Sequence, residues 1–178
     1  MGLKKRLTTF VSNWLGVIIA ALIVIISATF GGMYLYARSR LDNTINFVTQ
    51  VINLRYPDGL TLSGTADNPA GHLVLQVVNP SADTVDVSIS DVSITLGTDT
   101  MVVVKDGSWD KSVPTGYTTF EGDITIDAQT FAALVSQGKV TLDIKGVISA
   151  SGQYKWVKRD NQRPFNISIP GVSLHLNS

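Results

Sequence analysis

The fold class of this chain is decided by the stretch HLVLQVVNPSADTVDVSISDVSITL, residues 72–96. Apolar residues alternate with polar ones on both sides of Asn79-Pro80, which is the period-two pattern of half-buried β-strands. Pro80 cannot donate a hydrogen bond to a neighbouring strand and favours an extended residue before it, so the pair closes the first strand. The alternation then slips by one residue at Ser90-Asp91. Because such a slip inverts every following side chain, we expect a bulge or bend there.

A short apolar strand is expected at residues 101–104, and further strands follow toward the C-terminus at 120–126, 140–148, 165–169 and 172–176. Short strands with turn signals at intervals of about 8–12 residues are typical of a β-sandwich. One segment breaks the rhythm, DAQTFAALVSQG at 127–138, where Asp127 suits an N-cap and Gly138 a C-terminal cap. The sequence therefore predicts a mainly β domain over 60–178 with one short helix. A polar loop, KRDNQR, is expected at 158–163.

The N-terminal part has a different pattern, with no charged residue from Leu7 to Ala37. A bilayer core of about 30 Å needs roughly 20 apolar helical residues, and 14–37 supplies them. Trp14 at one end and Tyr34 and Tyr36 at the other match the aromatic belts of a membrane helix. A cleaved signal peptide is the alternative, but its apolar region is shorter and ends at an A-x-A-like site. The sequence favours a retained transmembrane helix at 14–37 after a basic N-terminus at 1–13.

Charge is distributed unevenly although the whole chain is neutral. Residues 1–40 hold five Lys and Arg and no acid, whereas 41–178 hold nine Lys and Arg against fourteen Asp and Glu, a net of −5. A negative domain repels phosphate backbones, so nucleic acid is not expected as a partner. The bases before the helix outnumber those after it, which predicts a cytoplasmic N-terminus and an extracytoplasmic domain at the cell membrane. The chain has no cysteine, which excludes disulfides and thiolate chemistry.

Between the anchor and the first strand, Leu41, Ile45, Val48 and Ile52 recur at helical spacing. This pattern predicts a helical stalk over 38–59, ended by the Pro and Gly of the segment YPDG. The apolar stripe is expected to pack on its own domain, and a partner helix is the alternative. Within the membrane helix two small-xxx-small pairs, at 27 and 31 and at 28 and 32, would permit close approach of a second helix.

The search for chemistry identifies no catalytic, metal or cofactor constellation. His72 and His175 are far apart in sequence and fit no metal-ligand spacing, and Glu121 is placed on a solvent-facing strand position. Asp106 and Asp110 are the densest acidic pair but lack a calcium-loop pattern. We therefore expect a protein that is not an enzyme and needs no cofactor. The sequon beginning at Asn166 is interpreted as a chance match within a strand.

A basic and aromatic segment, KWVKRDNQR at 155–163, is the candidate interaction surface. Such a hairpin could touch lipid headgroups or an acidic protein partner. The alternative is a solvated hairpin tip whose aromatic rings turn into the core. The candidate residues are Tyr154, Trp156, Lys158, Arg159 and Arg163.

The order of these features resembles the water-stress-and-hypersensitive-response (WHy) domain of the atypical late-embryogenesis-abundant (LEA type 2) proteins. The resemblance covers residues 60–170 and is carried by the following features: the strand into Asn79-Pro80, the bulged strand 85–96, Val113-Pro114, the helix 131–135 with Gly138, VTLDIKG and Pro164-Phe165. Ser81 departs from the second asparagine of many members. The resemblance implies an immunoglobulin- or fibronectin-III-like sandwich, often behind one membrane anchor, with no catalytic residues to carry over.

Two functions remain open at this point. The first is a membrane-anchored sandwich that binds or shields something at the outer face under desiccation or osmotic stress, a role that the resemblance implies. The second is a small structural or accessory subunit of a membrane or cell-envelope complex, because exposed strand edges template β-addition by a neighbour. The expected partners are the bilayer, through 14–37, and a protein at the stalk or the strand edges.

Overall fold

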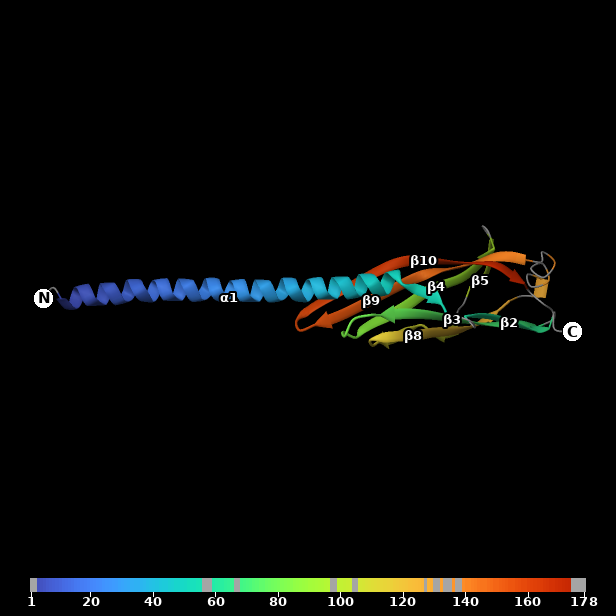
Figure 1. Cartoon of the computed structure of the whole chain (residues 1–178), viewed down its shortest axis with the longest axis horizontal. Helices are drawn as coiled ribbons and strands as arrows, with labels where there is room; N and C mark the ends of the chain where they lie inside the picture. The colour runs from blue at the N-terminus through green and yellow to red at the C-terminus, as the bar shows by residue number, and fades with distance from the viewer. Residues whose placement is uncertain are drawn as a thin grey trace. The chain divides into compact units, whose positions relative to one another are not determined.

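The computed structural model describes residues 3–55, 59–65, 68–96, 99–103, 106–126 and 139–173, together with residues 128, 129, 132 and 136. Two compact units divide the chain, Met1–Arg40 and Leu41–Ser178. The described residues contain one long helix and ten strands (Figure 1). Their bounds are α1 Leu3–Gln50, β1 Ile52–Leu54, β2 Leu60–Thr65, β3 Asn68–Asn79, β4 Val85–Leu96, β5 Asp99–Val103, β6 Asp106–Ser108, β7 Asp110–Val113, β8 Gly116–Thr125, β9 Lys139–Tyr154 and β10 Val157–Ser173.

The first unit contains the apolar part of α1 and the basic residues on either side of it. Its large apolar side chains from Trp14 to Tyr36 are all between 41% and 66% exposed. Among the described residues, α1 is the one helix long and apolar enough to cross a membrane by length and composition. An apolar helix that buries so little of its surface within the protein is compatible with a single-pass membrane anchor.

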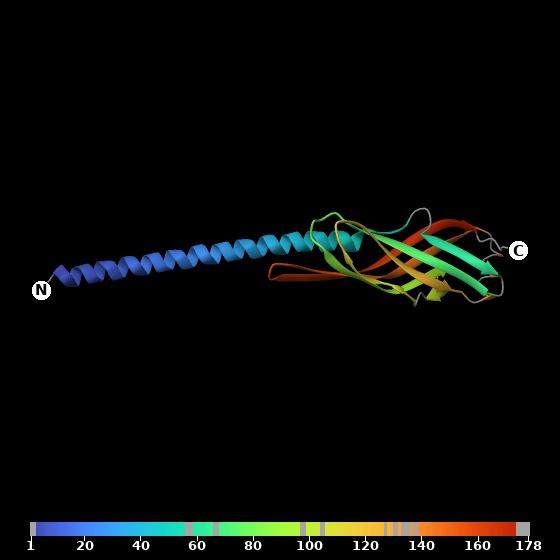
Figure 2. The same ribbon diagram turned by 90° about the horizontal axis from the view of Figure 1, so that it is seen from below.

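The second unit is a β-sandwich of two antiparallel sheets, as the alternating sequence pattern predicts (Figure 2). The first sheet has the strand order β1-β3-β8-β6, with β2 also paired to β3. The second sheet has the order β10-β9-β4-β5, with β7 also paired to β4. The fold class predicted from the sequence, a mainly β sandwich behind one N-terminal apolar helix, is confirmed.

The core lies between the inner faces of the two sheets. In the first sheet it is built from alternate residues of β3 and β8, among which Leu73, Leu75, Val77 and Phe120 have no measurable exposure. Alternate side chains of a strand point to opposite faces, so each apolar run of the sequence supplies one side of this core. The buried residues of the second sheet include Val85, Val87, Ile89, Ile94, Leu142, Ile144 and Ile148.

The predicted irregularity in β4 is present. Asp91 has φ 53°, and the pairing of β4 with β9 shifts in register between Ser90 and Ser93. Asp tolerates this left-handed conformation better than most residues do, because its short polar side chain can bond locally. The extra residue moves the apolar positions from Val87 and Ile89 to Val92 and Ile94 while all four stay buried. The one-residue slip is therefore a β-bulge that keeps the same face of β4 in the core.

The expected helical stalk over 38–59 is wrong in its C-terminal part. α1 ends at Gln50, and Ile52–Leu54 form β1, which pairs antiparallel with β3. The apolar stripe of the helix packs on its own domain, since Leu41, Ile45 and Val48 are at most 2% exposed. Ile52 continued the helical spacing in the sequence, but the spacing of four residues fits a strand as well as a helix. The last turns of α1 are thus part of the sandwich core.

The predicted polar loop at 158–163 is also wrong, because these residues lie in β10. They pair one by one with β9 in a long hairpin. Two polar side chains on the face of β10 that packs against α1 contact this helix. Arg159 Nε lies 3.2 Å from Asp42 Oδ1, and Asn161 Nδ2 donates to Asn46 Oδ1 at 2.8 Å. A polar residue on the inner face of a strand is tolerated when its charge or dipole is paired. The helix therefore allows β10 to form from a polar sequence.

The short helix expected at 127–138 falls mostly outside the described residues. Ala128, Gln129, Ala132 and Ser136 are helical. The predicted caps Asp127 and Gly138 lie outside the described part of the chain, as do the final residues 174–178 with His175.

Candidate functional site

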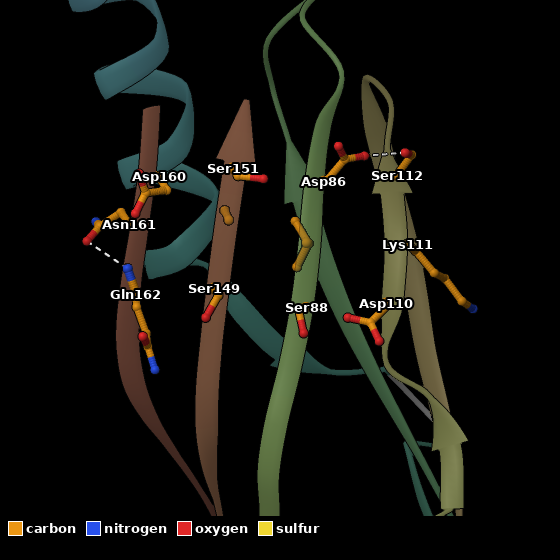
Figure 3. A pocket seen from close by; sticks show the side chains of 12 residues that line it. Asp86, Ser88, Asp110, Lys111, Ser112, Ser149, Ser151, Asp160, Asn161 and Gln162 are labelled. Carbon is orange, nitrogen blue, oxygen red and sulfur yellow. Dashed lines mark hydrogen bonds between the residues drawn. The ribbon is translucent and has the colours of Figure 1, made fainter. Parts of the chain in front are cut away.

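A polar groove crosses the outer face of the second sheet, over strands β10, β9, β4 and β7 (Figure 3). Its main hollow has a volume of about 440 Å³, and a second hollow of about 290 Å³ continues it toward the β9–β10 turn. The two hollows share Asp86, Ser151 and Asp160. No hollow was expected here from the sequence.

The register of the sheet arranges the groove as two rows of side chains. Ser151 pairs with both Asp86 and Asp160, and Ser88 pairs with both Ser149 and Asp110. Short serine side chains occupy the middle strands, so the floor of the groove is low. The first row is Asp160, Ser151, Asp86 and Ser112, and the second is Gln162, Ser149, Ser88 and Asp110.

The main hollow of the groove is acidic, whereas Lys158 and Arg159 line the smaller one. Asp86, Asp110 and Asp160 all line the main hollow, and Asp86 accepts a hydrogen bond from Ser112 Oγ. The main hollow has one basic lining residue, Lys111, whose Nζ instead donates to Thr119 O at 2.7 Å. Figure 3 shows the Lys111 side chain directed away from the other lining side chains. Carboxylates and hydroxyls in this arrangement can accept hydrogen bonds from ammonium and hydroxyl groups of a ligand.

The predicted interaction surface is only partly assembled. At the β9–β10 turn, Lys155 Nζ lies 5.9 Å from the centroid of the Tyr154 ring and 6.0 Å from that of Trp156. Trp156 is 52% exposed, so the alternative in which its ring turns into the core is wrong. A lysine over two aromatic rings, one of them strongly exposed, forms an amphipathic hairpin tip.

The three cationic side chains of the predicted surface do not lie on one face of β10. Lys158 is exposed and lines the smaller hollow. Arg159 points to the opposite face of β10, where it forms the ion pair with Asp42. Arg163 is exposed on the same face as Arg159 but four residues farther from the turn. Strand alternation therefore divides the basic segment between two faces, which sequence proximity alone could not reveal.

His72 forms a cluster with Glu121 and Asp123 of β8 on the outer face of the first sheet, which the sequence did not indicate. His72 Nδ1 lies 2.9 Å from Asp123 Oδ1, and His72 Nε2 lies 3.5 Å from Glu121 Oε2. The hydrogen bond to Asp123 raises the pKa of His72, with a smaller contribution from Glu121, while desolvation acts in the opposite direction. This histidine belongs to the first sheet and the serines of the groove to the second, so the two do not form a nucleophile and base pair.

The structure also places the acidic pair that was considered for calcium and the glycosylation sequon. Asp106 and Asp110 lie in β6 and β7, which belong to different sheets. In the part of the chain that the structure describes, three or more carboxylates and histidines are nowhere grouped so as to hold a metal ion. Asn166 of the sequon is exposed on β10, opposite Lys145 of β9.

The side chain of Asn79 has a structural role that the sequence did not indicate. It is completely buried, and its Nδ2 donates to Asp83 O at 2.8 Å and to Val113 O at 2.9 Å. Its Oδ1 accepts a hydrogen bond from Ser81 N at 2.9 Å. The asparagine of the Asn-Pro pair thus joins the β3–β4 turn to the end of β7, in addition to closing a strand.

The groove could have been suspected from the sequence, because outward positions of two strands are occupied by Ser or Asp in the runs DVSIS and ISAS. Its assembly depends, however, on β7 and β9 lying on either side of β4. This order joins segments that are far apart in the sequence.

Comparison with known proteins finds distant structural neighbours and no sequence relative. No family model matches the chain, and no curated protein sequence matches it. A protein from Archaeoglobus fulgidus of known structure is 11% identical, with a TM-score of 0.38 over 70% of this chain and 98% of the other. A candidate late embryogenesis abundant protein is 9% identical, with a TM-score of 0.25 over 85% of this chain and 90% of its own. These scores are too low to carry an argument about function.

Proposed function

We propose that this protein is a membrane-anchored binding module that is not an enzyme, with its sandwich on the extracytoplasmic side. The observation that carries the proposal is the continuity of α1. The same helix is apolar and exposed from Trp14 to Tyr36, and its last turns supply Leu41, Ile45 and Val48 to the sandwich core. The helix thus joins the apolar segment directly to residues that belong to the folded domain.

The continuity of α1 favours a retained anchor over a signal peptide. Signal peptidases act just after a short apolar segment, at a site with small residues. Here helix continues from Leu3 to Gln50, and a cut after the apolar segment would have to be made within it. The excess of Lys4, Lys5 and Arg6 over Arg38 and Arg40 supports a cytoplasmic N-terminus.

The acidic groove of the second sheet is the proposed binding face. Its three carboxylates and its serines suit a partner with ammonium or hydroxyl donors, such as a lysine-rich segment or a polyol. A protective role in desiccation or osmotic stress rests on the WHy-like sequence features alone. In that case the chain would be a divergent WHy domain of the LEA type 2 group.

Membrane extraction and accessibility labelling test the anchor and its orientation. The chain has no cysteine, so Ser12→Cys and Thr141→Cys each give one thiol. We expect both variants to stay in the membrane at alkaline pH. In intact cells a membrane-impermeant maleimide should label the thiol at 141 and leave the thiol at 12 unlabelled. A chain released by alkali, or one with the reverse labelling, would contradict the proposal.

Purification in mild detergent followed by mass measurement tests the binding face. The variant Asp86→Lys with Asp110→Lys reverses the charge of the groove, and Asp123→Lys is a matched control on the other sheet. We expect a partner retained by the unaltered protein and by the control to be lost from the double variant. A chain that co-purifies in fixed stoichiometry with all three proteins would instead favour the accessory-subunit function.

A further inference from the structure

The turn between β9 and β10 projects from the sandwich. In both views it extends past the ends of the other strands (Figures 1 and 2). Tyr154 pairs with Val157, so Lys155 and Trp156 alone form the connection. Val157 is buried, whereas Trp156 is 52% exposed at the tip. Within the second unit, the exposed large apolar side chains among those described are Phe47, Tyr117 and Trp156.

This tip lies at the end of the unit where Leu41 is found. A Cβ atom added to Gly152, two residues before Tyr154, would lie 3.3 Å from Leu41 Cδ2 and 3.7 Å from Ile45 Cδ1. The polar contacts give the direction, because Arg159 faces Asp42 while Asn161, farther from the tip, faces Asn46. Moving along β10 toward the tip therefore corresponds to moving along α1 toward Leu41.

Leu41 is joined to the end of the apolar segment by a very short piece of chain. The four residue steps from Ala37 to Leu41 span at most about 14 Å, even if fully extended. The Leu41 end of the sandwich is therefore joined to the end of the apolar segment by a connection of at most this length. The exposed tryptophan is thus on the end of the sandwich from which this short connection to the apolar segment leaves.

The chemistry of the tip suits the headgroup layer. Tryptophan and tyrosine combine an apolar ring with a polar group and are enriched at membrane interfaces. Lys155, with its ammonium about 6 Å from both rings, can extend to lipid phosphates. The surrounding charge is mixed, because Asp160 is exposed near Lys158 and Asp42 is paired with Arg159. Such a balance favours zwitterionic lipid and an aromatic contact over attraction to an anionic surface.

We propose that the β9–β10 turn lies in the headgroup layer of the bilayer that α1 crosses, with Trp156 as the anchoring side chain. This inference rests on the proposed function, since it requires that residues 14–37 span the membrane. The tip then forms a second attachment to the bilayer, which limits the directions in which the acidic groove can face.

A nitroxide label measures the depth of the tip. We would reconstitute the full chain in phosphatidylcholine nanodiscs with one thiol at Lys155→Cys, and compare collision rates with oxygen and with a water-soluble nickel chelate. Thr141→Cys is the aqueous control; it lies thirteen residues before Tyr154, the end of β9, which is about 43 Å at 3.3 Å per residue. Leu22→Cys is the control for the apolar interior.

We expect the label at 155 to collide with the chelate severalfold less often than the label at 141. In the Lys155→Cys chain, Trp156→Ser should restore the high chelate rate while Trp156→Tyr should keep it low. Equal chelate rates at 155 and 141, with the label at 22 still protected, would overturn this inference alone. Protection at 155 that required anionic lipid would overturn it as well, because an aromatic contact does not need that charge. Free chelate access at 22 would overturn the proposed function too.

Discussion

At the scale of single residues, the most constrained side chain is the buried amide of Asn79. It satisfies Asp83 O and Ser81 N in the turn that follows β3, and Val113 O at the end of β7. A buried polar group left without its partner costs about 1–3 kcal/mol. Because three backbone groups depend on this one amide, it cannot be exchanged for an apolar side chain of the same size.

Replacing Asn79 should therefore destabilise the sandwich strongly. We expect Asn79→Ala to lower the free energy of unfolding by about 3 kcal/mol, since it leaves three backbone groups without their partner. Chemical denaturation of the detergent-solubilised chain would measure it. Asn166→Ala, at an exposed position of β10, is the control and should change stability by no more than about 0.5 kcal/mol. Equal effects of the two changes would contradict the importance given to Asn79.

Gly146 is constrained by a ring on the neighbouring strand. A Cβ at this position would lie 2.7 Å from Phe165 Cζ and 3.1 Å from Ser90 O. We expect Gly146→Ala to cost about 1–3 kcal/mol, the usual range for overpacking. Phe165→Leu removes the near ring atoms, so the double variant should lose less stability than the two single changes added together. Additive losses would show that the ring does not determine the effect.

His72 should make stability depend on pH in a known direction. Its pKa is raised in the folded protein by Asp123, so the folded state holds the proton more tightly than the unfolded state. The resulting stabilisation is complete below the unfolded pKa of about 6.5 and is lost as pH rises through the folded pKa. Proton NMR should find the imidazole of His72 titrating above pH 6.5. In His72→Gln this part of the pH dependence should disappear, and an unchanged pH profile would contradict it.

At the scale of elements, the hairpin of β9 and β10 depends on the last turns of α1. The sequence KRDNQR has no apolar alternation, which is why we expected a loop there. The partners that allow a strand, Asp42 and Asn46, lie more than a hundred residues earlier in the chain, so no local pattern could indicate them. In contrast, the bulge at Ser90-Asp91 was predictable, because it depends only on alternation within one strand.

The ion pair between hairpin and helix offers a direct test of this dependence. Arg159→Asp places a carboxylate beside Asp42, and we expect it to lower the urea midpoint of unfolding. The exchange of both charges, Arg159→Asp with Asp42→Arg, should recover part of the loss. Because the pair is partly exposed, its coupling should be about 0.2–1 kcal/mol. If the double variant were no more stable than Arg159→Asp, the two side chains would not be coupled.

At the scale of the whole molecule, the sandwich includes the last turns of α1, the helix whose apolar part belongs to the other unit. Three side chains of α1 are buried as deeply as any in the sheets, and β1 follows immediately. From the sequence, the division between an anchor and a mainly β domain was clear. The residue at which the domain starts was not clear from the sequence. An apolar stripe on a helix has the same pattern whether it packs on the sheets of its own domain or on a partner protein.

Two truncations distinguish a domain that begins near Leu41 from one that begins at residue 60. A chain lacking residues 1–40 should be soluble and unfold cooperatively. A chain lacking residues 1–59 loses Leu41, Ile45 and Val48 and one strand of the first sheet, so it should aggregate or lack a cooperative transition. Far-UV circular dichroism with thermal unfolding would measure both. Equal stability of the two chains would show that the helix contributes nothing to the core.

The contact between Asn46 and Asn161 has a consequence for biosynthesis. The two residues are 115 positions apart, so the last turns of α1 are synthesised long before the part of β10 that they contact. At about 5–20 residues per second, that interval is roughly 6–23 s. During it, the apolar side chains of Leu41, Ile45 and Val48 have nothing to cover them. A ribosome-bound chain of this protein should therefore need protection by chaperones close to the membrane surface.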